Sequence, residues 1–183
     1  MAPVLLSLDA SVNLAGLRGQ RTVKLSDFFV GYRKTVLEPD EVMVSVSIPR
    51  VAASDSTHVN SYKVSKRREL DIAIVAAGFF LQHDAAGMIT QARLGYGGVA
   101  ATPARARKTE EFLQGKPWNE ETVQGAKAVL ATEFAPIDDV RAAAEYRKNL
   151  IVSLFEKFWL KEESAAQDAP LDFEVGTLYP EAD

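Results

Sequence analysis

The spacing of apolar residues changes along the chain, from the alternation typical of strands to the spacing typical of helices. Residues 41–49, EVMVSVSIP, alternate between two faces and end at a proline, which predicts a β-strand. Residues 61–100 read as about three antiparallel strands, whereas apolar residues after position 103 recur at helical spacing. Strands followed by helices are typical of an α+β fold. We therefore expect a small antiparallel sheet of about three strands packed with C-terminal helices, preceded by a short strand and turn segment.

Three helices are expected in the last third. A short one within 102–118 closes near Gly115 and Pro117, a second begins at an Asn119 cap, and a third spans about six turns of residues 140–163. The third carries a stripe at helical spacing that we assign to the core rather than to a cofactor site. Its members are Tyr146, Leu150, Leu154, Phe155 and Phe158. From Ser164 the periodicity is lost, which predicts an acidic tail or linker over 164–183.

Composition narrows the classes of function. The net charge of −4 argues against nucleic acid or an anionic membrane as a partner. The chain has no cysteine, so thiol nucleophiles and Cys-ligated metals are excluded within it. No apolar run reaches membrane-spanning length and the first residues do not resemble a signal peptide, so we expect a cytoplasmic protein.

The two histidines, His58 and His83, lie in polar stretches that read as loops. We expect them to be solvated rather than to bind metal or act as bases, because no carboxylate stands at ligand spacing. The segment LGYGGVAATP contains closely spaced glycines but does not open a helix, so it is a weak dinucleotide motif. Close backbone approach or a β-bulge is the better interpretation of these glycines.

A basic turn, Lys66 to Arg68, stands between SYKV and a strand rich in small residues. It could be a solvated turn, a patch for an acidic partner or nucleic acid, or a loop beside an anionic cofactor. Lys63 differs from the other cations because it belongs to the preceding strand, where its side chain points to one face of the sheet. The small residues Ala73, Ala76 and Gly78 leave room for a backbone or a flat ligand.

Four segments in order give the chain a specific resemblance. They are FFVGYRKTVLEPDEVMVSVSIP, SYKVSKRRELDIAIVAAGF, ARLGYGGVAATPARARKTEEFLQGKPW and EYRKNL. Together they resemble the C-terminal part of the FAD domain of xanthine dehydrogenase and related molybdenum hydroxylases, similar to the carbon monoxide dehydrogenase flavoprotein C-terminal domain. The resemblance implies that residues 1–50 end an FAD-binding subdomain and that 51–163 form the flavoprotein C-terminal domain.

The resemblance also implies roles. Electrons would pass from a molybdenum cofactor through [2Fe–2S] clusters, held in other domains or subunits, to FAD and then to NAD or oxygen. Lys63 and Met43 match flavin contacts, and a cation beside the ring would stabilise its reduced form. The loop with Arg67, Arg68 and Asp71 would gate the acceptor. FAD would need the remaining, pyrophosphate-binding subdomain; the alternative is a non-enzymatic module that binds an acidic partner through the basic turn.

Overall fold

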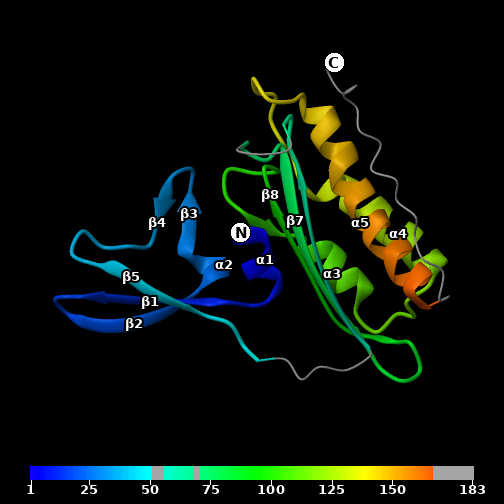
Figure 1. Cartoon of the computed structure of the whole chain (residues 1–183), viewed down its shortest axis with the longest axis horizontal. Helices are drawn as coiled ribbons and strands as arrows, with labels where there is room; N and C mark the ends of the chain where they lie inside the picture. The colour runs from blue at the N-terminus through cyan, green and yellow to red at the C-terminus, as the bar shows by residue number, and fades with distance from the viewer. Residues whose placement is uncertain (51–55, 68–70, 167–183) are drawn as a thin grey trace, which may run out of the picture.

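The computed structural model describes residues 1–50, 56–67 and 71–166. Of these, residues 164–166 are described as backbone only. Figure 1 shows two sheets side by side, with helix α1 (Ala2–Ser7) between them. The fold is α+β, with antiparallel strands and helices concentrated toward the C-terminus, which confirms the predicted class.

The N-terminal block, residues 1–50, has its own sheet and its own core. Its sheet has the order β2-β1-β5, and a separate two-stranded ribbon, β3-β4, follows the short helix α2. Leu6, Val12, Leu14 and Phe28 are buried at its centre. The bounds are β1 Ser11–Gly16, β2 Gly19–Lys24, α2 Leu25–Phe28, β3 Phe29–Gly31, β4 Lys34–Thr35 and β5 Val42–Ser47.

Strand β5 is where predicted, but it is exposed on both faces. Its register pairs it with β1 alone, with Met43 opposite Leu14, so it forms an edge of the sheet. Val42 and Val44 are 64% and 61% exposed. The alternating pattern correctly predicted the strand; within the described chain nothing covers the apolar face that it implied.

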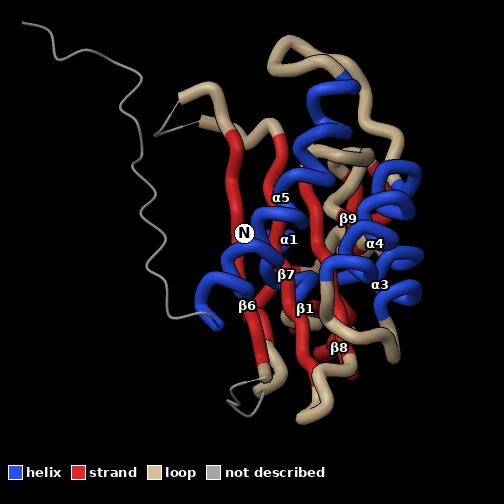
Figure 2. The backbone as a smooth tube through the Cα atoms, turned by 90° about the vertical axis from the view of Figure 1, so that its right-hand side faces the viewer, coloured by secondary structure: helices blue, strands red, loops and turns tan. Residues whose placement is uncertain are grey.

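The larger part of the molecule is a four-stranded antiparallel sheet of order β6-β7-β8-β9, with three helices on one face (Figure 2). It has one strand more than the three predicted, because the two-residue β9 pairs with β8. The strands are β6 Thr57–Val64, β7 Val75–His83, β8 Ile89–Gly97 and β9 Ala104–Arg105. The helices are α3 Arg107–Leu113, α4 Glu120–Glu133 and α5 Ala144–Ala166.

The sequence signals that delimit the helices are present in the structure. The Asn119 side chain accepts a hydrogen bond from the Thr122 amide and caps α4. Of the predicted aromatic stripe, Phe155 and Phe158 are fully buried against the sheet. Tyr146 is 48% exposed, so its assignment to the core was wrong.

The second face of the large sheet receives α1 at its glycines. A Cβ on Gly78 would lie 2.6 Å from the Cα of Val4, and one on Gly95 would lie 2.3 Å from the carbonyl oxygen of Pro3. These separations are too short for any side chain, so only glycine permits the helix to lie so close. The close approach predicted for these glycines is confirmed, and at both positions the approaching group is backbone.

No helix within the described residues is both long and apolar enough to cross a membrane.

Candidate functional site

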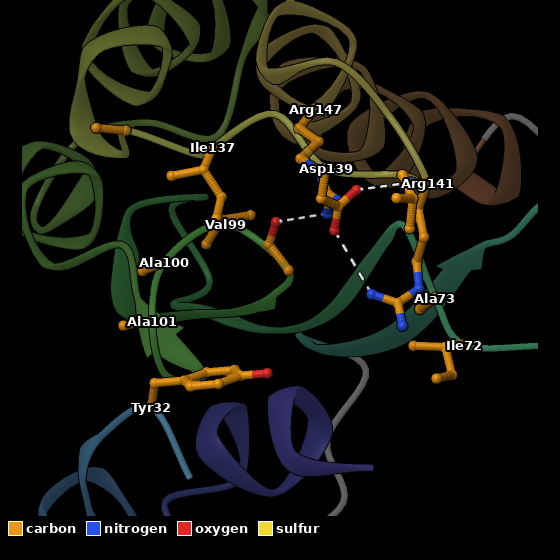
Figure 3. Close-up of a pocket in the computed structure, with 13 residues that line it drawn as sticks. Tyr32, Ile72, Ala73, Val99, Ala100, Ala101, Ile137, Asp139, Arg141 and Arg147 are labelled. Atoms are coloured by element: carbon orange, nitrogen blue, oxygen red, sulfur yellow. Dashed lines mark hydrogen bonds and ion pairs between the residues drawn. The ribbon is translucent and has the colours of Figure 1, made fainter.

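A cavity of about 750 Å³ lies where β7 begins and β8 ends. Its walls come from four segments that are distant in sequence. They are the turn between β3 and β4, the start of β7, the turn after β8, and the loop that leads into α5. Figure 3 shows Tyr32 on the opposite side of the cavity from Asp139 and Arg147. The apolar lining includes Ile72, Ala73, Val99, Ala100, Ala101, Ile137 and Val140. A mainly apolar cavity with a few polar groups is suited to an organic ligand.

Arg147 holds two walls of this cavity together. It is 4% exposed, and its Nη1 donates to the carbonyl oxygens of Ile74 and Gly98, at 2.5 Å and 3.0 Å. Its Nη2 donates to Asp139 Oδ1 at 2.6 Å. One side chain therefore ties the start of β7, the turn after β8 and the loop before α5.

Asp139 is the anionic partner in this arrangement. Its Oδ1 also accepts hydrogen bonds from the backbone amides of Arg141 and Ala142, at 2.9 Å and 3.0 Å. The Arg141 amide and then the Arg147 guanidinium stabilise the carboxylate and lower the pKa of Asp139 to about 2. The cavity wall thus carries a fixed carboxylate that is ionised near neutral pH.

Gly98 completes the wall in a conformation that few other residues adopt. Its φ is +81°, and a Cβ there would lie 2.2 Å from the carbonyl oxygen of Ile74. The turn after β8 can therefore approach the start of β7 only because residue 98 is glycine. This contact accounts for the glycine-rich segment without a dinucleotide.

The loop of residues 64–72, called the gating loop after the role that the resemblance implies for it, borders the same cavity through Ile72. Asp71 stabilises the described part of this loop, because its carboxylate accepts hydrogen bonds from the amides of Arg67 and Ile72, at 3.0 Å and 2.8 Å. The Arg67 amide is the main cause of the lowered pKa of Asp71. Arg67 Nε lies 3.9 Å from the same carboxylate. Asp71 thus organises the loop rather than projecting into the cavity.

The basic turn is partly engaged within the molecule. Lys66 Nζ donates to the carbonyl oxygen of Val140, at 3.0 Å, and so links the gating loop to the loop before α5. Arg68 lies outside the described residues. The charge of Lys66 is therefore used within the molecule.

Lys63 lies on β6 and lines a second cavity, of about 440 Å³. Its Nζ makes no hydrogen bond or ion pair with any described residue. The same cavity is lined by Ala73, Ala76 and Ala77 and by the start of α1. Ala73 therefore belongs to both cavities, and the two adjoin at this residue.

The structure does not bring Met43 next to Lys63. Met43 lies on β5 of the N-terminal sheet, and neither cavity is lined by it. Its side chain is 44% exposed.

Both histidines lie on strands, so their assignment to loops was wrong. His58 belongs to β6 and His83 ends β7, with their Nε2 atoms 3.1 Å apart. Within residues 1–50, 56–67 and 71–166, no group of three or more His, Asp or Glu side chains is arranged to hold a metal ion.

Comparisons with known proteins identify the class of this fold. Residues 60–162 match the family described as CO dehydrogenase flavoprotein C-terminal domain, and the chain therefore belongs to that family. Residues 1–51 match a second family, described as FAD binding domain in molybdopterin dehydrogenase. The two matches are consecutive along the chain, and the resemblance stated from the sequence is confirmed.

The curated proteins that this chain resembles include dehydrogenases. A xanthine dehydrogenase/oxidase of Gallus gallus is 38% identical over 166 residues, which are 86% of this chain and 12% of that protein. The nicotinate dehydrogenase FAD-subunit of Eubacterium barkeri is 32% identical and is covered over 52% of its length, against 84% of this chain. This chain thus spans about an eighth of the first relative and half of the second.

Solved structures give the same result. The Cu,Mo-CO dehydrogenase in its cyanide-inactivated form has a chain that superposes with a TM-score of 0.77 at 27% identity, over 86% of this chain and 54% of its own length. Quinoline 2-oxidoreductase from Pseudomonas putida 86 gives a TM-score of 0.76 at 28% identity, over 91% and 56%.

Arg147, Asp139 and Tyr32 were not among the predicted site residues. The segment YRKT contains Tyr32 and the segment EYRKNL contains Arg147, but a sequence does not show that both segments reach one cavity. The signal that could have found Arg147 is an arginine within a helix whose neighbouring apolar residues are buried.

Proposed function

We propose that this chain forms the isoalloxazine side of the FAD domain of a xanthine dehydrogenase-like molybdenum hydroxylase. The observation that carries the proposal is the pair of adjoining cavities. Most of their lining residues match the flavoprotein C-terminal domain, and Tyr32 and the start of α1 come from the residues that match the FAD-binding domain. In this proposal Ala73, common to both cavities, lies against the flavin ring.

The residues present fit a flavin ring. A flat aromatic group needs apolar walls and small side chains, and Ala73, Ala76 and Ala77 provide them beside Lys63. Lys63 has no described partner, so its charge is available to a ligand. When bound, FAD would supply the electron-pair transfer between the donor centres and the final acceptor.

We assign separate tasks to the protein groups. Lys63 would place a positive charge near the ring and favour its reduced form. Arg147, by joining Ile74 to Gly98, would keep the cavity wall rigid while an acceptor enters. The gating loop with Arg67, Arg68 and Asp71 would control that entry, and the acceptor would be NAD or oxygen.

Strand β5 supports a role for a further subdomain. It is an edge strand with exposed apolar side chains on both faces, and such a strand is suited to pair with and be covered by additional protein. We propose that Met43 and its neighbours contact the pyrophosphate-binding part of the FAD domain there, with the backbone of Met43 near FAD. Iron–sulfur and molybdenum domains or subunits would complete a cytoplasmic enzyme.

Assembly with FAD tests this function. The pyrophosphate-binding subdomain of a relative such as the Eubacterium barkeri FAD-subunit would be mixed with this chain and FAD, and the flavin absorption spectrum recorded. We expect the resolved vibronic shoulders of protein-bound flavin only when both proteins are present. A spectrum that stays that of free FAD, at concentrations where the two proteins co-elute, would refute the proposal.

The variant Met43→Asp tests whether β5 contacts the pyrophosphate-binding subdomain. It adds a charge to exposed β5, and we expect it to weaken co-elution of the two proteins. Leu17→Asp, at a 93% exposed position of the β1–β2 turn, is the control and should leave co-elution unchanged.

A further inference from the structure

The pair of histidines lies at the opposite end of the four-stranded sheet from the cavity of about 750 Å³. His58 and His83 are diagonal neighbours on β6 and β7 and project to the face covered by α5. Figure 1 shows this end, with the β7–β8 hairpin and the last turns of α5, on the lower side of the molecule. A cavity of about 340 Å³ opens beside the rings.

The hydrogen bonds of the two rings fix where their protons are. His83 Nδ1 lies 3.0 Å from the backbone carbonyl oxygen of Asp84, which can only accept, so Nδ1 carries a hydrogen. His58 Nδ1 contacts the carboxylate of Glu162, which also accepts from Asn60 Nδ2 at 3.0 Å. Nδ1 of His58 is therefore a donor too.

The acceptor role of Glu162 is itself determined by its neighbours. Lys161 Nζ donates to Asn60 Oδ1 at 2.8 Å, which leaves the amide nitrogen of Asn60 for Glu162. The chain of donors from Lys161 through Asn60 thus orients the carboxylate toward His58.

With both Nδ1 atoms protonated, each neutral ring presents a lone pair at Nε2. The two Nε2 atoms nevertheless lie 3.1 Å apart. Two acceptors at this distance repel each other unless a cation lies between or beside them. That cation can be a shared proton or a metal ion.

We propose that His58 and His83 bind one divalent transition-metal ion, of the Zn²⁺, Ni²⁺ or Cu²⁺ class, through their Nε2 atoms. Imidazole nitrogens are preferred ligands of these ions. Metal-binding histidines donate their other ring N–H to a carboxylate or a backbone carbonyl, and His58 and His83 show one of each.

The separation of the two nitrogens also suits a metal. With Zn–N bonds of about 2.0–2.1 Å, two nitrogen ligands of a tetrahedral ion lie about 3.3 Å apart. The rings need only a small displacement from 3.1 Å to reach this distance. The remaining positions would be filled by water, because no third His, Asp or Glu side chain of the described residues is arranged to complete the site.

The chain contains its own reporter for this site. It has two tryptophans, and both Trp118 and Trp159 line the cavity next to the histidines. Cu²⁺ bound there should quench their fluorescence. The experiment titrates CuCl₂, ZnCl₂ and NiCl₂ into untagged, chelator-treated protein, with Zn²⁺ and Ni²⁺ measured by calorimetry.

We expect saturable binding of one ion per chain that weakens at least tenfold in His58→Gln and in His83→Gln. Glu162→Gln keeps both ligands but removes the carboxylate behind His58, so it should weaken binding about 10- to 100-fold. Glu145→Gln makes the same charge change near the start of α5 and should leave the affinity unchanged.

A readout on the wild-type protein keeps the proposal testable if the variants do not fold. The chain has only two histidines, so ¹⁵N NMR of the imidazoles reports on both. Zn²⁺ should shift both Nε2 resonances together. Unshifted resonances, or quenching that is non-saturable and equal in the histidine variants, would overturn the proposal and leave a shared proton as the cation.

Discussion

Gly98→Ala is the substitution for which the structure gives the sharpest expectation. Residue 98 has a φ of +81°, and an alanine Cβ would lie 2.2 Å from the Ile74 carbonyl oxygen. The left-handed conformation costs about 1–2 kcal/mol for a residue with a Cβ. Displacing packed backbone adds about 1–3 kcal/mol. The sum is about 2–5 kcal/mol in the free energy of unfolding.

Gly87→Ala is the matched control, because Gly87 has a φ of +77° and no atom within 4 Å of the corresponding Cβ position. It should show only the conformational cost, about 1–2 kcal/mol. Urea unfolding followed by tryptophan fluorescence measures both values. Equal losses of stability in the two variants would show that the contact between Gly98 and Ile74 contributes nothing, contrary to this expectation.

Three further changes test other parts of the structure. Asn119→Ala removes the α4 cap and should lower the free energy of unfolding by about 1 kcal/mol, whereas Asn119→Asp should retain most of it in the same urea assay. Because the pKa of Asp139 is lowered from 3.8 to about 2, its contribution to stability is complete above pH 3.8 and is lost as the pH falls toward 2. The stability difference between wild type and Asp139→Asn should therefore be largest near neutral pH and shrink below pH 3.8; a constant difference would contradict this. In the assembled FAD domain, Lys63→Met should lower the flavin potential by about 1–2 kcal/mol, or roughly 20–45 mV for two electrons, whereas Lys108→Met should not change it.

The sequence predicted the secondary structure where local signals are strong. The Asn119 cap and the turn at Gly115 delimit helices where expected, because capping and left-handed glycine depend on neighbouring residues alone. Strand β5 was equally clear from its alternation. The exposure of β5 could not be predicted, because an alternating pattern shows which face is apolar but not whether the same chain covers that face.

Tertiary contacts account for what the sequence left out. Arg147 contacts Ile74 and Gly98, which lie 73 and 49 residues away, and no local pattern encodes such pairings. The histidines were misread for a similar reason. His58 and His83 have polar neighbours that suggest loops, but His58 pairs with Leu81 between β6 and β7, and His83 pairs with Ile89 between β7 and β8.

The proposed position of the flavin ring against Ala73 is tested by the FAD affinity of an Ala73→Phe variant. A phenyl group there would fill the junction of the two cavities. In the assembled FAD domain we expect an FAD dissociation constant raised at least tenfold for Ala73→Phe and unchanged for Ala128→Phe, on the exposed face of α4. An Ala73→Phe protein that binds FAD as tightly as the wild type would show that the ring lies elsewhere.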